Sequence, residues 1–541
     1  TYNDESKLVF WHKYVNYNSG TPHEHGKSNQ DFINHTIGVT GLIFGSVATT
    51  NPAESEVAIA YPISVKNEWN GGLSGYETVW GNDHNWSAGR VPLSTDDVLI
   101  PNGKTYYPSL TGDVVAKSIE ISSGASITAN TFNITISGSG GAWMNNGMFN
   151  PGTGKVLFNH GVLADIVTVS GTTNFYNIEC GANTTMQPVA GSTLRIAGNG
   201  TAFETSVVDF STINNTVEYN GAGQTIVNPN GIGGNSGYYN LIFSGSGIKT
   251  MPTSDMTING NLTLSGTASV TSASSIIVKG DLVINDAATF NTGTSSHNVG
   301  GNIENYSTFT SQSGQTITMN GTIAQWIGGT NALNFYNLTI NNSTGVTIYS
   351  NVGVNNSLTL TSGNLNIGGT KVDKIVNHNS GRKISNDKTR KDSKKSTEVQ
   401  TDNPLEEDYN LVIHGNLSLS GGNQIDATSS NSTVEFAGAS AQTISAGTFV
   451  NNSINALKIN NASGVSLGGD LSLEGLLTLS NGLLNTGSYT LAFGIMAADP
   501  VETSSSRIVG TARIAGVPTS TGSFSFLSCK IEAGSDDLGH I

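Results

Sequence analysis

The sequence predicts an all-β protein, a parallel β-helix (solenoid) built from short repeats, and three observations carry this prediction. A phrase of thirty residues occurs twice without a gap, at residues 340–369 and 459–488, and twelve of its thirty positions are identical. Large aliphatic residues alternate with small polar ones, as in residues 262–264 and 358–360, and this period of two is typical of strands. Charged residues make up only 12% of the chain, whereas glycine contributes 66 residues. Together these features favour stacked β-units over helices.

Residues 1–66 do not share the repeat, and we expect them to form a non-repeat N-terminal β segment. The segment contains an H-x-H sequence, formed by His23 and His25 around Glu24. Two such histidines on a strand share one face, as zinc and copper sites can require, so His23 and His25 are candidate metal ligands. No third ligand stands at a recognised spacing, and solvated loop histidines are the alternative interpretation.

Residues 67–150 are interpreted as a Trp-rich cap followed by the first rungs. The first rung of a stacked sheet exposes apolar surface and unpaired backbone, so it needs a cover. We interpret the adjacent pair Asp96 and Asp97 as a turn or capping element rather than a metal site. The aromatic residues available for the cover are Trp69, Trp80 and Trp86.

Two blocks, residues 151–370 and 409–494, are predicted to form the solenoid repeats. Valine, isoleucine and leucine suit the inward positions, whereas serine, threonine and asparagine suit the outward ones. Coils of about twenty residues would stack about 4.8 Å apart, and stacked asparagines would form ladders along the axis. A second phrase supports the repeat: TVEY with a following QTI near residue 220, and TVEF with a following QTI near residue 437.

Corners between strands need residues that accept a left-handed backbone, which predicts that role for Asn341, Asn342 and Gly345. The second copy predicts the same role for Asn460, Asn461 and Gly464. A string of β-sandwiches of about a hundred residues each is the rival architecture. The repeat spacing argues against it, because related asparagines at positions 177, 240 and 337 are 63 and then 97 residues apart.

Residues 371–408 interrupt the repeat with a charged insertion that we expect to be flexible. Residues 371–395 contain nine Lys or Arg against three Asp, and residues 396–408 contain five Asp or Glu. A segment so charged and so poor in large apolar residues cannot bury enough surface to fold alone. A docking or processing site and a tolerated surface loop are both open interpretations. Residues 495–541 differ from the repeat and are predicted to form a C-terminal β module that is truncated.

Composition also limits the function classes. The net charge of −15 argues against nucleic acid as a partner, and no apolar run is long enough for a membrane-spanning helix. No phosphate loop, dinucleotide fingerprint or calcium nonapeptide occurs, so we predict no cofactor and no catalytic residue. Polysaccharide chemistry on a solenoid needs paired carboxylates at one site. Here Glu218 and Glu435 occupy equivalent repeat slots, and Asp281, Asp470 and Glu474 stand singly.

Several phrases resemble the repeats of very large surface proteins that the type IX secretion system exports. The phrases are TVEF…QTI, FYNLTINNSTGV and LTLTSGNLNIGG, with the entry WGNDHNWSAGRVPLSTDDVLIP, and the resemblance covers about residues 68–494. RIVGTARIAGVPTSTGSFSF resembles the module that follows such repeats, although FLSC from Phe526 replaces the usual FPVG. The family's C-terminal sorting domain is not present, which agrees with truncation.

The resemblance implies secretion, a location on the cell surface and an adhesive or scaffolding role. We therefore expect a non-enzymatic, extracellular stalk or adhesin-like surface protein, with surface glycans or other cell-surface proteins as partners. The alternatives are a carbohydrate-active β-helix enzyme, a polysaccharide lyase or hydrolase, and a glycan-binding solenoid without catalysis.

Overall fold

A computed structural model describes residues 66–230, 237–369, 408–494, 497 and 500–514, together with the backbone of short strands outside these ranges. At the N-terminal side β1 (Val9–Tyr14) pairs antiparallel with β2 (His23–Gly26) and β5 (Ser55–Ala60), and β3 (Asn29–Asp31) pairs with β4 (Thr36–Gly38). At the C-terminal side β50 (Ser523–Phe526) and β51 (Cys529–Glu532) are also antiparallel. The predicted non-repeat N-terminal β segment is thereby confirmed.

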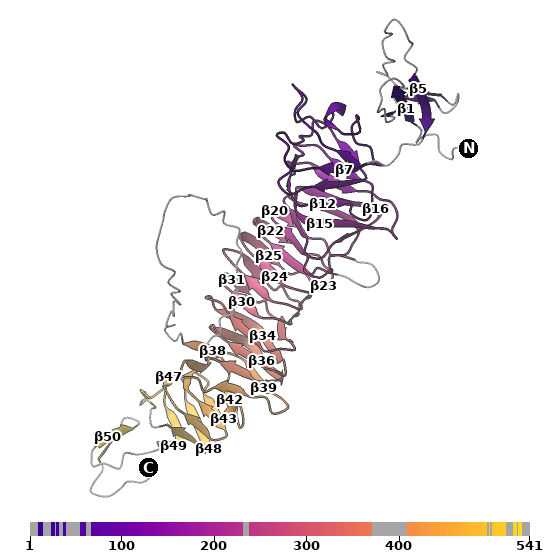
Figure 1. Cartoon of the computed structure of the whole chain (residues 1–541). Helices are drawn as coiled ribbons and strands as arrows, with labels where there is room; N and C mark the ends of the chain where they lie inside the picture. The colour runs from indigo at the N-terminus through magenta and orange to yellow at the C-terminus, as the bar shows by residue number, and fades with distance from the viewer. Residues whose placement is uncertain are drawn as a thin grey trace, which may run out of the picture. The chain divides into compact units, whose positions relative to one another are not determined.

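The chain divides into two units, residues 1–297 and residues 298–541. Within each unit parallel strands are stacked coil upon coil, and the solenoid has about 18 turns in the described ranges (Figure 1). The described ranges contain almost no helix, apart from the short 3-10 turn η2 (Asp83–Asn85). The prediction of an all-β parallel β-helix is therefore confirmed.

Three strands make one coil, as the middle of the first unit illustrates. There β23 (Met256–Ile258), β24 (Leu262–Leu264) and β25 (Thr267–Thr271) are followed by three strands that pair with them in the same order. Met256 pairs with Ile276 and Leu262 with Leu282, and in both cases the difference in residue number is 20. The predicted coil length of about twenty residues is confirmed.

The first unit contains the following solenoid strands, in addition to β23, β24 and β25. They are β6 (Lys66–Glu68), β7 (Asp97–Ile100), β8 (Val114–Ala116), β9 (Ser118–Ile121), β10 (Ser126–Thr128), β11 (Ile134–Ile136), β12 (Trp143–Asn145), β13 (Met148–Asn150), β14 (Lys155–Phe158), β15 (Ile166–Phe175), β16 (Asn177–Pro188), β17 (Thr193–Ile196), β18 (Phe203–Val208), β19 (Thr216–Tyr219), β20 (Ala222–Thr225), β21 (Asn240–Phe243), β22 (Ser246–Thr250), β26 (Ile276–Val278), β27 (Leu282–Ile284) and β28 (Thr289–Asn291). Strand β29 (His297–Val299) contains the last residue of this unit.

The second unit continues the same strand pattern. Its strands are β30 (Ile303–Asn305), β31 (Thr308–Thr310), β32 (Thr316–Met319), β33 (Gln325–Gly328), β34 (Leu333–Asn341), β35 (Val346–Ile348), β36 (Val352–Ser362), β37 (Leu365–Ile367), β38 (Tyr409–Ile413), β39 (Asn416–Leu419), β40 (Ile425–Ala427), β41 (Ser432–Phe436), β42 (Gln442–Ser445), β43 (Phe449–Ile454), β44 (Ala456–Asn460), β45 (Val465–Gly468), β46 (Leu471–Leu473), β47 (Leu477–Asn481), β48 (Leu484–Phe493) and β49 (Ile508–Ile514). Parallel pairing of β49 with β48 extends the stack past residue 494.

The coils on either side of the charged insertion pair directly with each other. Strand β36 pairs with both β38 and β39, and β37 pairs with β40, so each strand before the insertion meets its successor after it. Asn351 Oδ1 accepts hydrogen bonds from the backbone and side-chain nitrogens of Asn410. Residues 370–407, which include most of the predicted insertion, lie outside the described residues.

The alternation of the sequence fills the interior of each coil. In β24 the two leucines are at most 1% exposed while Thr263 between them faces outward, and β27 repeats this pattern. Large apolar side chains stacked in this way are buried away from water in every coil, and this burial is the main source of stability for such a fold. Near the N-terminal end of the solenoid, two tryptophan pairs meet edge to face, and their members are Trp69, Trp80 and Trp86, each at most 2% exposed.

The corner prediction holds for the glycines and is wrong for the asparagines. Gly345 and Gly464 have φ of 87° and 84°, the left-handed region that glycine enters without strain. Among described residues other than glycine, positive φ occurs at Asn130, Asn183, Asn214, Asp286, Asn451 and Asn452, and not at the four corner asparagines. The corner asparagines instead act through their side chains: Asn342 Oδ1 accepts from Thr344 N at 2.9 Å and so closes the turn.

The predicted asparagine ladder is present, mostly in a side-chain-to-backbone form. Asn240 Oδ1 accepts from the backbone nitrogen of Asn261, and Asn261 Oδ1 accepts from that of Asp281, at 3.0 and 2.8 Å. A direct amide-to-amide bond of 2.6 Å joins Asn356 to Asn337. Each such bond connects one coil to the next, so these outward asparagines are occupied in holding the stack together.

Candidate functional site

A glutamine recurs at the same corner in three coils, buried in two of them, and connects each corner to the preceding coil. Gln224 Oε1 accepts from Gly221 N at 2.9 Å, and its Nε2 donates to Ile196 O and Gly198 O, both at 2.8 Å. Gln325 makes the same set with Gly321, Val299 and Gly301, and Gln442 makes it with Gly438, Ile413 and Gly415. We call these three residues the corner glutamines. Their role is structural, since every polar atom of the amide is occupied.

The remaining acceptor position of each corner glutamine is filled from the following coil. In the two later copies the donor is a corner asparagine, since Asn342 Nδ2 donates to Gln325 Oε1 and Asn461 Nδ2 to Gln442 Oε1, both at 2.9 Å. In the first copy the donor is Lys249, whose ammonium lies 2.8 Å from Gln224 Oε1 and 2.7 Å from Gly221 O. Lys249 is only 1% exposed, and this burial lowers its pKa to about 8.

The repeat-equivalent carboxylates that the sequence singled out are both paired with a cation on a neighbouring coil. Glu218 Oε2 accepts from Arg195 Nε at 2.7 Å, and Glu435 Oε2 lies 3.1 Å from Lys458 Nζ. Both pairs are direct register neighbours in their sheets. The contacts match the structural role that repeat equivalence predicts for this slot.

One carboxylate pair was missed by sequence analysis. Glu179 on β16 and Glu204 on β18 are register neighbours, and both bind Lys155 Nζ, at 2.7 and 3.4 Å. The hydrogen bond to Glu179 raises the pKa of Lys155, so the ammonium stays charged at neutral pH. Two acids and a base in contact are the residue types that polysaccharide chemistry uses. Here, however, both carboxylates are engaged with one ammonium.

The other predicted acidic residues do not meet one another. Asp96 is fully buried beneath Arg90, with which it forms two hydrogen bonds, and it also accepts from Leu93 N at 2.9 Å. Asp97 points elsewhere and binds Lys117 and Ser118. Asp96 therefore closes a turn, as the sequence predicts, whereas Asp97 connects β7 with the next coil. Of the acids that stand singly in the sequence, Asp470 accepts from Thr490 N and Glu474 from Ser472 Oγ.

The metal site predicted at His23 and His25 remains a prediction. The backbone places His23 and His25 in β2, where His23 stands opposite His12 of β1, but their side chains lie outside the described residues. In the ranges whose side chains are described, no group of three or more His, Cys, Asp or Glu residues is arranged to hold a metal ion. His160 in that part bridges Ser137 O and Asp165, and these partners raise its pKa.

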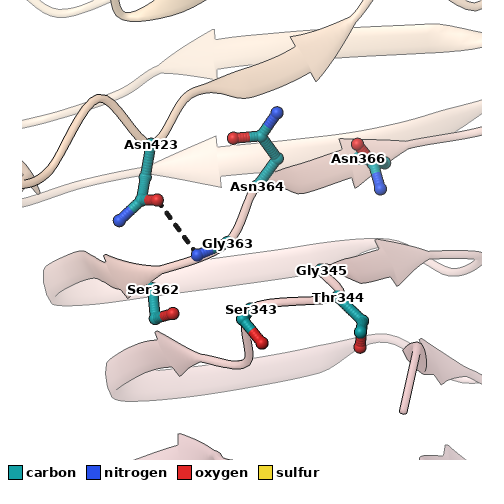
Figure 2. A pocket seen from close by; sticks show the side chains of 8 residues that line it. All are labelled: Ser343, Thr344, Gly345, Ser362, Gly363, Asn364, Asn366 and Asn423. Atoms are coloured by element: carbon teal, nitrogen blue, oxygen red, sulfur yellow. Dashed lines mark hydrogen bonds between the residues drawn. The ribbon is translucent and has the colours of Figure 1, made fainter. Parts of the chain in front are cut away.

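A pocket of about 500 Å³ opens at the corners of successive coils in the second unit. Figure 2 shows that its walls come from three turns of the chain, at residues 343–345, 362–366 and 423. Asn423 Oδ1 accepts from Gly363 N at 3.0 Å and so joins two of these turns. The lining consists only of serine, threonine, glycine and asparagine. Such a site offers neutral donors and acceptors and has neither a charge nor a nucleophile activated by a base.

Within the described ranges, no helix has the length and hydropathy needed to cross a membrane.

Comparisons with known proteins found no relative of this chain. No protein-family model matches the chain, and neither the curated proteins nor the solved structures contain a match.

Proposed function

We propose that this chain is a non-enzymatic, extracellular stalk or adhesin-like surface protein that presents its solenoid to other molecules. One observation carries the proposal: outward carboxylates such as Glu218 and Glu435 are used in contacts between coils. The pocket at the coil corners is likewise neutral and polar. Such a surface is suited to many weak polar contacts and not to bond cleavage.

The proposed partners are surface glycans or other cell-surface proteins. Hydroxyl and amide groups like those at Ser343, Thr344 and Asn366 complement the hydroxyl groups of neutral sugars. The net charge of −15 disfavours nucleic acids and strongly acidic polymers. The resemblance of the repeats to type IX secretion cargo supports the proposed location at the cell surface.

A binding experiment tests this proposal. The chain is displayed at low and at high density on beads, and retention of a panel of neutral and acidic polysaccharides is compared. Binding by many weak contacts predicts that retention of neutral polysaccharides rises much more steeply than the density of the chain. Loss of all retention on bead surfaces of any density would contradict the proposal, and so would tight one-to-one binding by the chain in solution.

A carbohydrate-active enzyme is the second candidate, and the cluster of Lys155, Glu179 and Glu204 is the observation that favours it. The cluster brings two carboxylates and a lysine together on the outer surface of the first unit. A retaining or inverting hydrolase needs its two carboxyl groups free to act on the substrate, whereas here both are engaged with one ammonium. The stalk proposal therefore remains the better supported of the two.

A further inference from the structure

The backbone nitrogen of Ile276 donates its hydrogen bond to a histidine side chain. The acceptor is Nδ1 of His297, at 3.0 Å. One coil earlier the corresponding nitrogen, that of Met256, donates to the backbone oxygen of Ser275 at 2.9 Å. The atom that corresponds to this oxygen in the next coil is Ser296 O, and it accepts from the hydroxyl of Ser275 at 2.8 Å. At Ile276 an imidazole therefore takes the place of a backbone acceptor between two coils.

The second ring nitrogen of His297 is also engaged, and this fixes the protonation state of the ring. Nε2 lies 2.7 Å from the backbone oxygen of Thr292, which can only accept, so Nε2 carries a hydrogen. Nδ1 accepts from the nitrogen of Ile276 and therefore carries none. Together the two contacts require a neutral imidazole in the Nε2–H tautomer.

The ring of His297 lies in the apolar interior of the first unit. Strands β26 and β29 are neighbours in one sheet, and each begins with a buried residue, Ile276 and His297. The imidazole is 3% exposed, and its centroid is 6.3 Å from the ring centroid of Phe290 on β28. Burial lowers the pKa of His297 because the charged form loses its water, and the hydrogen bond to Thr292 O opposes this effect.

The charged residues on the coils around His297 are engaged in contacts of their own. Asp255 accepts from Ser275 N at 3.1 Å, and Lys279 donates to Asn259 Oδ1 at 2.7 Å. Burial and the carbonyl of Thr292 are the causes of the shift in the pKa of His297. Besides His297, the residues of the segment 250–348 that can titrate are Asp255, Lys279, Asp281, Asp286, Glu304, Tyr306 and Tyr336.

We propose that His297 makes this part of the first unit sensitive to acid, so that uptake of a proton at Nδ1 breaks the contact with Ile276 and opens the coil locally. A proton on Nδ1 would point at the hydrogen of Ile276 N, and two donors would then face each other. It would also place a charge beside Phe290 in the interior. Opening relieves both costs, because the imidazolium then reaches water. The inference does not depend on the stalk proposal.

The effect should be confined to a defined pH range. Since the pKa of His297 in the closed coil lies below its usual 6.5, the open coil binds more protons than the closed one between that lower value and pH 6.5. The equilibrium constant for opening should therefore rise as the pH falls through this interval, by up to about tenfold per pH unit for one proton. Well above pH 6.5 it should stay constant, because the imidazole is neutral in both forms.

Hydrogen exchange of the full chain, read peptide by peptide with mass spectrometry between about pH 5 and pH 8, tests this inference. After correction for the intrinsic exchange rate, protection of residues 273–280 should be constant at the upper end and fall several-fold toward the lower end. Strands β12 and β17 of the same unit serve as internal references and should keep their protection throughout.

Three variants assign the effect to the imidazole. His297→Gln keeps a donor and an acceptor without a titrating group, and His297→Ile introduces the residue that begins β26. In both variants the corrected protection of residues 273–280 should be independent of pH, whatever its level, so either variant is informative if the other is unstable. His160→Gln is the matched control, because it removes another histidine of the same unit and should retain the pH dependence of the natural chain.

Several results would overturn the proposal. The same pH dependence in the natural chain, His297→Gln and His297→Ile would assign it to other groups. A loss of protection that extends equally to β12 and β17 would mean general acid unfolding and no local opening. Constant protection of residues 273–280 over the whole pH range would show that this contact is insensitive to acid.

Discussion

The ammonium of Lys249 donates a 2.8 Å hydrogen bond to Gln224 Oε1, the atom that receives an asparagine amide in the two later copies of this corner. Lys249 stands opposite Gln224 in the register, and a valine stands opposite the corner glutamine in the later copies. In the first copy the side chain of Lys249 thus takes the strand position that a valine has in the later copies, and it also makes the hydrogen bond that an asparagine makes there. Because this places an ammonium in the interior, it has consequences for the pH dependence of stability.

The free energy of unfolding should rise with pH between about 8 and 10.5 through Lys249. Burial lowers the pKa of Lys249 from its usual 10.5 to about 8 in the folded chain. In that interval the unfolded chain binds more protons at this residue than the folded chain, so raising the pH favours folding. Below pH 8 both states are protonated, and the cost of burying the charge, at most about 3 kcal/mol, is present in full.

The measurement is the difference in unfolding free energy between the natural chain and Lys249→Met at several pH values from 7.5 to 9.5. Methionine keeps the aliphatic stem and has no titrating group, so other ionisations cancel in the difference. The unfolding free energy of the natural chain should increase relative to that of the variant as the pH rises. A difference that is flat over this range would show that Lys249 keeps an ordinary pKa in the folded chain.

Substitution of a corner glutamine should lower the stability of the chain more than substitution of an outward residue near it. Gln325 is 2% exposed, and its amide bonds to three backbone groups and to Asn342. Gln325→Ala would leave several buried groups without partners, at about 1–3 kcal/mol each, so we expect a local loss of about 3 kcal/mol or more. Thr339→Ala on the neighbouring β34 is the control and should cost less than about 0.5 kcal/mol.

Hydrogen exchange is the suitable readout for this pair of variants, because coils of a solenoid can open in segments and exchange shows which of them lose protection. Protection should fall in β32, β33 and β35 of Gln325→Ala and stay unchanged in Thr339→Ala. Similar protection in both variants would contradict the importance of the amide.

Part of this structure could be predicted from the sequence, because it depends on local patterns. Alternation of residue types predicts which side chains face inward, and the thirty-residue phrase predicts that coils repeat. The recurring QTI phrases likewise mark two of the corner glutamines. The prediction of a left-handed backbone at the corner asparagines was wrong, because an asparagine can also close a turn through its side chain, as Asn342 does.

The acid–base clusters could not be predicted, because they depend on the register between coils. Glu179 and Glu204 are 25 residues apart, not the usual twenty, so their proximity follows only from the observed pairing of β16 with β18. The hydrogen bond from Trp326 to Glu304 likewise joins two coils and could not be predicted from the sequence.

Trypsin should cut the chain in the basic segment while the two pieces stay together. Residues 371–395 contain nine Lys or Arg and few large apolar residues, which predicts ready cleavage. Strands β36 and β37 pair directly with β38, β39 and β40 across that segment, so these interstrand contacts should hold the pieces in one complex. Brief digestion followed by gel filtration, native and denaturing, checks this. Separation of the pieces under native conditions would show that the pairing across the insertion is too weak to join them.

Whether the chain turns over polysaccharide is the most direct test of the proposal that it is a non-enzymatic surface protein. The full chain is incubated with neutral and acidic polysaccharides, and new reducing ends and unsaturated products are followed over time. We expect no product above the buffer control, from the natural chain or from Glu179→Gln, Glu204→Gln, Asp281→Asn and Asp470→Asn. Turnover by the natural chain that any one of these substitutions abolishes would contradict the proposal and establish an enzyme.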